Sequence, residues 1–169
     1  LDTTLKAISL ILDKYPNIKL SVVGNPRENG HTERVIRQLN LTNHVSFKTN
    51  LSKEEVAYEY QSSSLAVISS LYEGFGMPLI EAISRNCKII CSDIPVFREI
   101  AGDIPDYFNP NESPSVLTKK IETALIKNAQ KFSSNINFID NYRFSNISEK
   151  FYLHVKNQNL KTININIVF

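Results

Sequence analysis

The sequence is poor in several residue types, and each shortage excludes a class of protein or a kind of site. Its 169 residues include no tryptophan, one methionine, two cysteines and five glycines. The two cysteines, Cys87 and Cys91, are too few for the disulfide framework of a small secreted domain, and three scattered histidines do not complete a zinc site. We interpret Cys87 and Cys91 as small core residues on one strand. Free cysteines of this kind fit a reducing cytoplasm.

Long apolar runs and blocks of charge are also missing. No segment approaches the roughly 20 apolar residues that span a bilayer, and no secretory signal pattern opens the chain. The net charge of +2 contains no basic block, so nucleic acid is not indicated as a partner. A hydrophobic fraction of 42% is ordinary for a globular protein. We expect a cytoplasmic domain with a sizeable core, and binding at a membrane surface stays open.

Helical and strand patterns alternate along the chain. Apolar spacing predicts helices at 2–15, 31–41, 52–60, 77–85 and 116–125, with more within 132–151, and strands at 18–23, 45–47, 65–69, 88–91 and 106–108. Ser52 and Glu55 form a capping box, and Asn86 is expected to end a helix in the left-handed conformation, as Gly usually does. Strands that alternate with helices predict an α/β fold with a Rossmann-like, doubly wound parallel sheet.

A glycine-rich turn between two carboxylates carries the strongest functional signal. The stretch reads Glu73-Gly-Phe-Gly-Met-Pro-Leu-Ile-Glu81. Gly74 and Gly76 permit a sharp bend and close approach of a ligand to the backbone, and Pro78 suits the first turn of a helix. The N–H groups of that turn favour a phosphate, and carboxylates accept hydrogen bonds from vicinal hydroxyls. The stretch therefore predicts a site for a phosphate attached to sugars.

The order of the predicted elements places this turn at a binding edge. Ligands of doubly wound sheets bind outside the carboxyl ends of the strands. Gly24, Asn50 and residues 69–76 all follow predicted strands. The topology therefore predicts that these three segments contribute to one site.

The same motif resembles the donor-binding signature of the retaining glycosyltransferases of the GT-B fold, family 4 (glycosyl transferases group 1). That signature has two glutamates with seven residues between them around a Gly-Phe-Gly turn, as Glu73 and Glu81 do. The similarity runs from about residue 5 to about residue 145, with further matches at 89–95, 98–103 and 107–110. It implies that the chain is the C-terminal, donor-binding half of such an enzyme.

The resemblance implies a role for each residue of the motif. Glu73 is expected to be catalytic, facing the donor sugar and its pyrophosphate, and Glu81 to hold the ribose hydroxyls. The other expected donor-binding residues are Gly24, Asn50, Leu51, Gly74, Phe75, Gly76, Met77, Pro78 and Leu79. Simpler roles stay open: Glu73 as a turn cap, Glu81 as a surface residue, and Phe75, Met77 and Leu79 as core residues. Asp93 and Glu99 are expected to fix loops.

The resemblance also implies the reaction. A hexose, such as mannose or glucose, would pass with retention from a nucleotide-diphosphate sugar to a glycan, lipid or protein acceptor. Backbone N–H groups and cations would stabilise the charge on the leaving diphosphate. No metal or other cofactor is expected, and the sequence has no Asp-x-Asp pair that would hold one.

Some features of the family have no counterpart. By the resemblance, we expect this sequence to lack the family's N-terminal acceptor domain, and also the first strand of the donor half with the Arg and Lys that follow it. Arg27 is a nearby cation, Asn50 stands where the family often has Gly, and Asn146 stands in place of Trp. We expect an exposed sheet edge, which costs stability or solubility, and weak donor binding with little transfer by the chain alone. Residues 1–150 are expected to form the donor domain, and 151–169 a helix end with an atypical tail.

Two other hypotheses stay open. The chain can be a non-catalytic or decayed nucleotide-sugar-binding module, or one half of a split enzyme, which the atypical tail favours and the intact glutamate pair disfavours. It can also be another sugar-nucleotide enzyme of similar fold, such as an epimerase, which the flanking matches disfavour. The sequence does not identify the nucleotide base or the sugar of the donor, nor the acceptor or the product.

Overall fold

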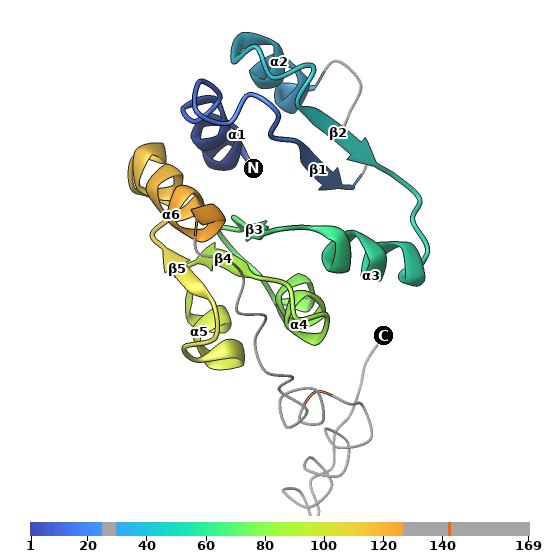
Figure 1. Cartoon of the computed structure of the whole chain (residues 1–169). Coiled ribbons are helices and arrows are strands. Elements are labelled where there is room, and N and C mark those ends of the chain that lie inside the picture. Colours follow the sequence, from blue (N-terminus) through green and yellow to red (C-terminus); the bar gives the residue numbers. More distant parts are fainter. Residues whose placement is uncertain (25–29, 127–141, 143–169) are drawn as a thin grey trace, which may run out of the picture. The chain divides into compact units, whose positions relative to one another are not determined.

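The structure is a computed structural model that describes residues 1–24, 30–126 and 142 (Figure 1). One compact unit spans Leu1–Ser134. Within the described ranges, no helix is long and apolar enough to cross a bilayer. The helices expected within 132–151, the tail at 151–169, Arg27 and Asn146 lie outside the described residues, so the predictions on them stay untested.

Helices and strands alternate along this unit, as the sequence predicts. The helices are α1 (Asp2–Ser9), α2 (His31–Gln38), α3 (Lys53–Ser62), α4 (Met77–Ser84), α5 (Pro95–Ala101) and α6 (Pro114–Ile126). The strands are β1 (Leu20–Val23), β2 (Val45–Lys48), β3 (Ala66–Ile68), β4 (Ile89–Ser92) and β5 (Asp106–Phe108).

All strand pairs in the described residues are parallel. β1 pairs with β2, β3 pairs with β4, and β4 pairs with β5. The predicted α/β fold class with parallel, Rossmann-like strand pairing is confirmed. One difference is that the strands form two sheets, β1-β2 and β3-β4-β5, so no direct pairing joins β1 to β3.

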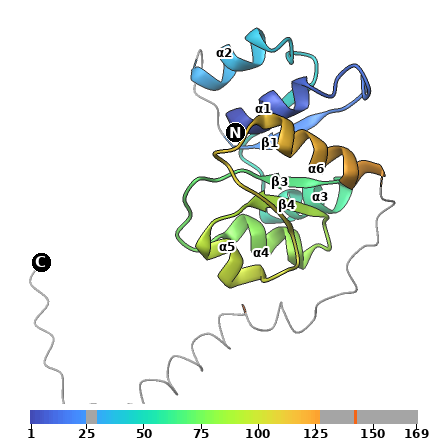
Figure 2. The ribbon, with the colours of Figure 1, turned by 90° about the vertical axis from the view of Figure 1, so that its left-hand side faces the viewer.

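Helices cover both faces of the three-stranded sheet. Figure 2 shows α1 and α6 on one side of β3 and β4, and α4 and α5 on the other. All four residues of β4 are buried, which explains why this strand has no alternating polar face. The main core cluster lies under α1 and α6 and includes Leu5, Ile11, Leu41, Ile90, Phe108, Leu117 and Ile121.

Helix α1 is shorter than the sequence predicts. It ends at Ser9 rather than at Tyr15. The Ser9 hydroxyl donates to the Lys6 carbonyl at 2.8 Å, and the Ile11 N–H donates to the Ile8 carbonyl at 3.1 Å. Serine hydroxyls compete with helical backbone bonds, and such three-residue spacing tightens the chain into turns. Ile11 is still buried although it lies after the helix. The apolar spacing that predicted a longer helix therefore reflects burial of the residues that follow α1.

Local signals predicted two helix ends correctly. Ser52 Oγ accepts from the Glu55 N–H at 3.2 Å, and Glu55 Oε2 accepts from the Ser52 N–H at 2.7 Å, so the capping box is confirmed. Asn86 follows α4 with φ of 52°, so the left-handed position is confirmed as well. Both predictions depend on side-chain and backbone chemistry within a few residues.

Helix α5 is an element that the sequence analysis missed. It has only seven residues, which is too short for a clear apolar period. Pro95 at its first position is the signal that was available, because proline favours the first turn of a helix.

The two cysteines are free and buried, as expected for core residues. Burial raises the pKa of the Cys91 thiol to about 12 and also raises the pKa of Cys87. Both thiols are therefore protonated and poorly nucleophilic at neutral pH. Cys91 lies on β4, whereas Cys87 precedes that strand, so the prediction that both lie on one strand is wrong.

Candidate functional site

The glycine turn connects the carboxyl end of β3 to the start of α4. Gly76 is the N-cap of α4 with φ of 68° and ψ of 34°, and Pro78 lies in the first turn of the helix. Leu79 is the first residue of α4 whose N–H donates to a preceding carbonyl, that of Gly76, at 3.0 Å. The predicted turn, with a helix starting at Met77, is confirmed.

The two glycines of the turn have different structural roles. A Cβ atom on Gly76 would lie 2.8 Å from Ile100 Cδ1 and 3.2 Å from Phe97 Cε1, so helix α5 packs directly behind the turn. Gly74 has no positive φ, and a Cβ atom there would meet nothing within 4 Å. Only Gly76 is therefore required by the fold, while the space around Gly74 leaves its backbone open to a ligand.

Glu73 is held by a neighbouring serine. Ser70 Oγ donates to Glu73 Oε1 at 2.7 Å, and both side chains are half-buried. This hydrogen bond restrains the rotation of the Glu73 carboxylate. The sequence placed Ser70 within the predicted binding segment 69–76, but its hydrogen bond to Glu73 was not predicted.

Glu81 lies on α4 beside a tyrosine from α3. Burial raises the pKa of Tyr60 to about 12, and the Glu81 carboxylate adds to that shift. Tyr60 therefore stays protonated at neutral pH. The half-buried Glu81 is not a freely solvated surface residue, and its neighbour Tyr60 was not predicted from the sequence.

The apolar members of the motif divide into two groups. Phe75 and Met77 are 51% and 50% exposed, so neither fills the core. Leu79 is fully buried, so its side chain belongs to the core, which is the simpler role that the sequence left open. Pro78 is half-buried.

The remaining predicted residues lie at the ends of the other sheet. Gly24 directly follows β1 with φ of 145°, and Asn50 follows β2 with φ of 56°. Both are exposed, and Leu51 is half-buried. These residues and the glycine turn each follow the carboxyl end of a parallel strand, as predicted, but they belong to different sheets.

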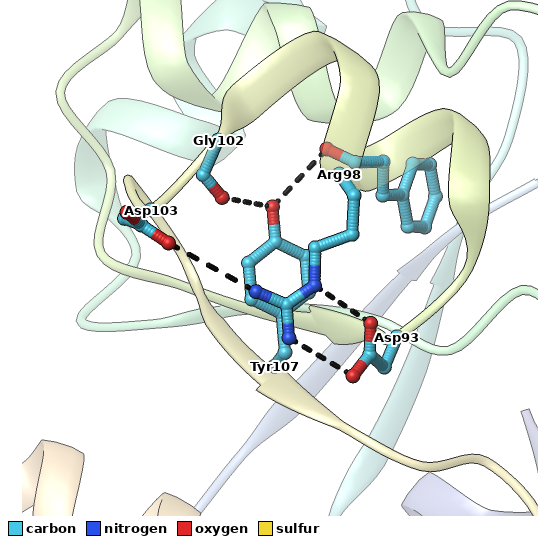
Figure 3. A network of polar contacts seen from close by, with 6 residues as sticks. Asp93, Arg98, Gly102, Asp103 and Tyr107 are labelled. Atoms are coloured by element: carbon cyan, nitrogen blue, oxygen red, sulfur yellow. Dashed lines mark hydrogen bonds and ion pairs between the residues drawn. The ribbon is translucent and has the colours of Figure 1, made fainter.

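A polar network anchors α5, the helix behind the glycine turn (Figure 3). The Arg98 guanidinium donates to the Asp93 carboxylate through Nε at 2.7 Å and Nη2 at 2.9 Å. The same guanidinium stacks on the Tyr107 ring, 3.6 Å from its centre. The Tyr107 hydroxyl donates to the Gly102 carbonyl at 2.6 Å, with the Phe97 carbonyl also in range at 3.1 Å. Asp93 therefore fixes a loop, as expected.

This network predicts an acid-sensitive contribution to stability. The hydrogen bonds from Arg98 hold the pKa of Asp93 below its ordinary 3.8. The contribution is therefore present above pH 3.8 and is lost as the pH falls through the lower pKa of the folded state. We expect Asp93→Asn to lower the urea midpoint at pH 7, and the difference from the parent chain to vanish at strongly acid pH.

Asp103→Asn is the matched control for that experiment. Asp103 is fully exposed, and its oxygen lies 4.0 Å from Arg98 Nη1. Exposed pairs of this kind contribute little, so the control is expected to follow the parent chain at every pH. An equal loss for Asp93→Asn at pH 7 and at acid pH would contradict the role of the ion pair.

Within residues 1–24 and 30–126, no group of three His, Cys, Asp or Glu side chains could hold a metal ion. The absence of a cofactor in the reaction stays a prediction. Phosphate charge at this site would be met by backbone N–H groups of the glycine turn, because the start of a helix carries unpaired donors and a partial positive charge.

Known proteins are similar to this chain in sequence and in fold. Residues 1–141 match the family described as glycosyl transferases group 1. Over 141 residues the chain is 34% identical to the serotype-specific mannosyltransferase WbdA of Escherichia coli, and the match covers 80% of this chain and 17% of WbdA. The chain thus spans only a small part of that relative.

Two solved structures have the same fold. The C-terminal domain of LpcC, a glycosyl transferase group 1 family protein from Francisella tularensis, matches with a TM-score of 0.65 and 23% identity, over 89% of this chain and 78% of that domain. Anabaena HepE, solved with UDP and glucose, matches with a TM-score of 0.71 and 19% identity, over 94% of this chain and 44% of HepE. The fold of this chain is that of the C-terminal half of a GT-B glycosyltransferase, and the chain belongs to the glycosyl transferases group 1 family.

Proposed function

We propose that this chain is the donor-binding domain of an enzyme that transfers a hexose, with retention, from a nucleotide-diphosphate sugar. The observation that carries the proposal is the glycine turn between Glu73 and Glu81, with an open backbone at Gly74 and a helix start at Met77. WbdA is a mannosyltransferase, which favours mannose, and glucose is the alternative. HepE was solved with UDP and glucose, which supports a nucleoside diphosphate and a hexose as the ligand chemistry.

The donor would lie across the start of α4. The amides of Gly76 and Met77 precede the first back-bonded amide of the helix and would bind the diphosphate. Glu73 would face the sugar and the pyrophosphate, and Glu81 would accept hydrogen bonds from the ribose hydroxyls. Gly24, Asn50 and Leu51 would contribute from the ends of β1 and β2.

The reaction would need little from this domain beyond positioning and charge stabilisation. In a retaining transfer without a metal, the diphosphate leaves and the acceptor attacks from the same face of the sugar. Backbone amides aimed at the diphosphate stabilise the charge that develops on it. A separate domain would bind the glycan, lipid or protein acceptor, in the cytoplasm or at a membrane surface, so we expect the isolated chain to bind donor weakly and to transfer little sugar.

Calorimetric titration of the purified chain with UDP-, GDP- and ADP-sugars tests this proposal. We expect selective binding of donors with one base, and about 10- to 100-fold weaker binding by Glu81→Ala. This loss corresponds to removal of a charged hydrogen bond of roughly 1.5–3 kcal/mol. The matched control is Asp13→Ala, which removes an exposed carboxylate from the turn after α1 and should bind like the parent chain.

Two outcomes would count against the proposal. Equal binding by Glu81→Ala and the parent chain would remove Glu81 from the site. No binding of any sugar nucleotide by a chain that circular dichroism shows to be folded would leave a non-catalytic or decayed module as the better explanation.

A further inference from the structure

Ser92, the last residue of β4, carries a buried hydroxyl group. The residue is fully buried, and its Oγ atom has no hydrogen-bond partner within the described part of the chain. Removal of a hydroxyl from water costs free energy unless new hydrogen bonds replace those to water, and most buried hydroxyls in proteins are therefore bonded. The position of Ser92 thus indicates a binding site for a small polar partner.

A second hydroxyl group lies next to Ser92, at the end of the neighbouring strand. Ile68 of β3 is opposite Cys91 of β4, so Ser69 lies opposite Ser92 one residue further along. Neighbouring strands of a sheet are about 4.8 Å apart. The two serines are therefore neighbours at the carboxyl ends of β3 and β4.

Both serine side chains point toward helix α1. Val67 and Ile90 pack into the main core cluster, which lies under α1 and α6. Alternate residues of a strand share one face, so Ser69 and Ser92, each two positions further along, face the same side. Thr4, which is buried in the first turn of α1, donates from Oγ1 to Ser69 Oγ at 2.9 Å, in agreement with this direction. The start of α1 therefore covers the two serines.

Each serine has hydrogen-bonding capacity that these contacts do not use. A serine hydroxyl has one proton to donate and two lone pairs that accept. Ser69 accepts from Thr4, but no acceptor among the described residues takes the Ser69 proton. Ser92 neither donates nor accepts there, so the two serines are not bonded directly to each other. Each of them therefore offers a donor and an acceptor to a common partner.

We propose that Ser69 and Ser92 bind one internal water molecule between the ends of β3 and β4. A water molecule donates and accepts, so it can bridge the two hydroxyls, and internal waters typically bond to such polar groups. Both hydroxyls are neutral, and the neighbouring carboxylate of Asp93 is exposed and bonded to Arg98. A calcium or magnesium ion requires more oxygen ligands than these two hydroxyls supply. Water is therefore the ligand that this site fits.

The bridging water would extend a hydrogen-bond chain across three elements. The chain would run from α1 through Ser69 to Ser92 on β4. Ser69 also begins the loop in which Ser70 donates to Glu73 Oε1 at 2.7 Å. Ser92 would thus be a positioning residue that acts through the start of this loop on Glu73. This consequence for the donor site rests on the proposed function, whereas the water site itself does not.

A crystal structure of the chain and urea unfolding of Ser92→Ala test the water site. We expect one ordered water within about 2.7–3.0 Å of both Ser69 Oγ and Ser92 Oγ. Ser92→Ala should raise the equilibrium constant of unfolding about 3- to 10-fold, because the water loses one of its partners. Removal of an unbonded hydroxyl would instead leave stability unchanged or raise it. Either of those results, or a crystal structure without this water, would overturn the proposal.

Thr118→Val is the matched control for the positioning role. Thr118 is also buried, but its hydroxyl bonds to the Ala7 carbonyl of α1 at 3.2 Å and to the Pro114 carbonyl of α6 at 3.0 Å, rather than to the loop. Both variants should lose stability, whereas sugar-nucleotide affinity should fall by about threefold or more in Ser92→Ala alone, because small shifts in a binding group weaken its contacts. Calorimetry measures both at a temperature at which they are folded.

The outcomes of this comparison separate the two proposals. Equal affinity losses in Ser92→Ala and Thr118→Val would overturn the positioning role of Ser92. If the folded parent chain binds no sugar nucleotide, the proposed function fails and the positioning role fails with it. The crystal structure and the urea experiment would still decide the water site in that case.

Discussion

Gly76→Ala is expected to lower the free energy of unfolding by about 2–5 kcal/mol. Two costs add at this position. An L-residue in the left-handed conformation costs roughly 1–2 kcal/mol, and φ is 68° here. The new Cβ atom would lie 2.8 Å from Ile100 Cδ1, and such overpacking costs typically 1–3 kcal/mol. Urea unfolding followed by circular dichroism measures the loss, with an expected fall in the thermal midpoint of roughly 5–15 °C.

Gly74→Ala is the matched control, two residues earlier in the same turn. It needs no positive φ, and its Cβ atom would meet nothing within 4 Å, so stability should change by less than about 1 kcal/mol. A second variant separates the two costs at Gly76. Ile100→Val removes the Cδ1 atom, so Gly76→Ala should be less damaging in that background, while the cost of the backbone angle stays. Equal losses for the two glycine variants would refute this description of the turn.

Phe97→Ala is expected to lower the free energy of unfolding by about 3–5 kcal/mol, the usual cost of truncating a large buried aromatic side chain. Phe97 is fully buried on α5. Its ring also packs behind Gly76, so the cavity left by truncation would open directly under the turn. We expect a loss of sugar-nucleotide affinity as well, measured at a temperature at which the variant is still folded.

Phe75→Ala is the comparison for stability. It removes the same side chain from the same region, but Phe75 is 51% exposed, so little core packing is lost. The expected change in the free energy of unfolding is below about 1 kcal/mol. Similar destabilisation by both substitutions would mean that α5 does not support the turn as the structure indicates.

Both predictions rest on the packing of the glycine turn against helix α5. The glycine turn rests on Phe97 and Ile100 of α5, and α5 is tied to the end of β4 by Arg98 and Asp93. The turn is therefore positioned by residues that would not touch the donor. Substitutions of Arg98 or Asp93 should act through the position of the turn rather than through ligand contacts.

The sequence predicted features that depend on a few neighbouring residues. The capping box at Ser52 and Glu55, the left-handed Asn86 and the helix start at Met77 are all set by local backbone chemistry. Parallel pairing also followed from the alternation of strands and helices. The chain order alone was therefore enough to place the glycine turn at a carboxyl end.

Features that depend on distant residues were not predicted. Tyr60 comes next to Glu81 only when α3 packs against α4, and Arg98 of α5 meets Tyr107 of β5 only in the folded chain. Gly76 and Gly74 differ because α5 packs behind Gly76 alone and because Gly76 alone has a positive φ. The division into two sheets likewise reflects which edges meet in space, which the order of elements does not reveal.

Asn50 shows that the turn after β2 requires a particular backbone conformation. The resemblance to the family implied Gly at this position, and Asn50 has φ of 56°, in the region where Asn is tolerated better than most other residues. The backbone here requires a positive φ, which both Gly and Asn can supply. A comparison of residue identities alone would treat Asn and Gly as different here, although both can adopt the same backbone conformation.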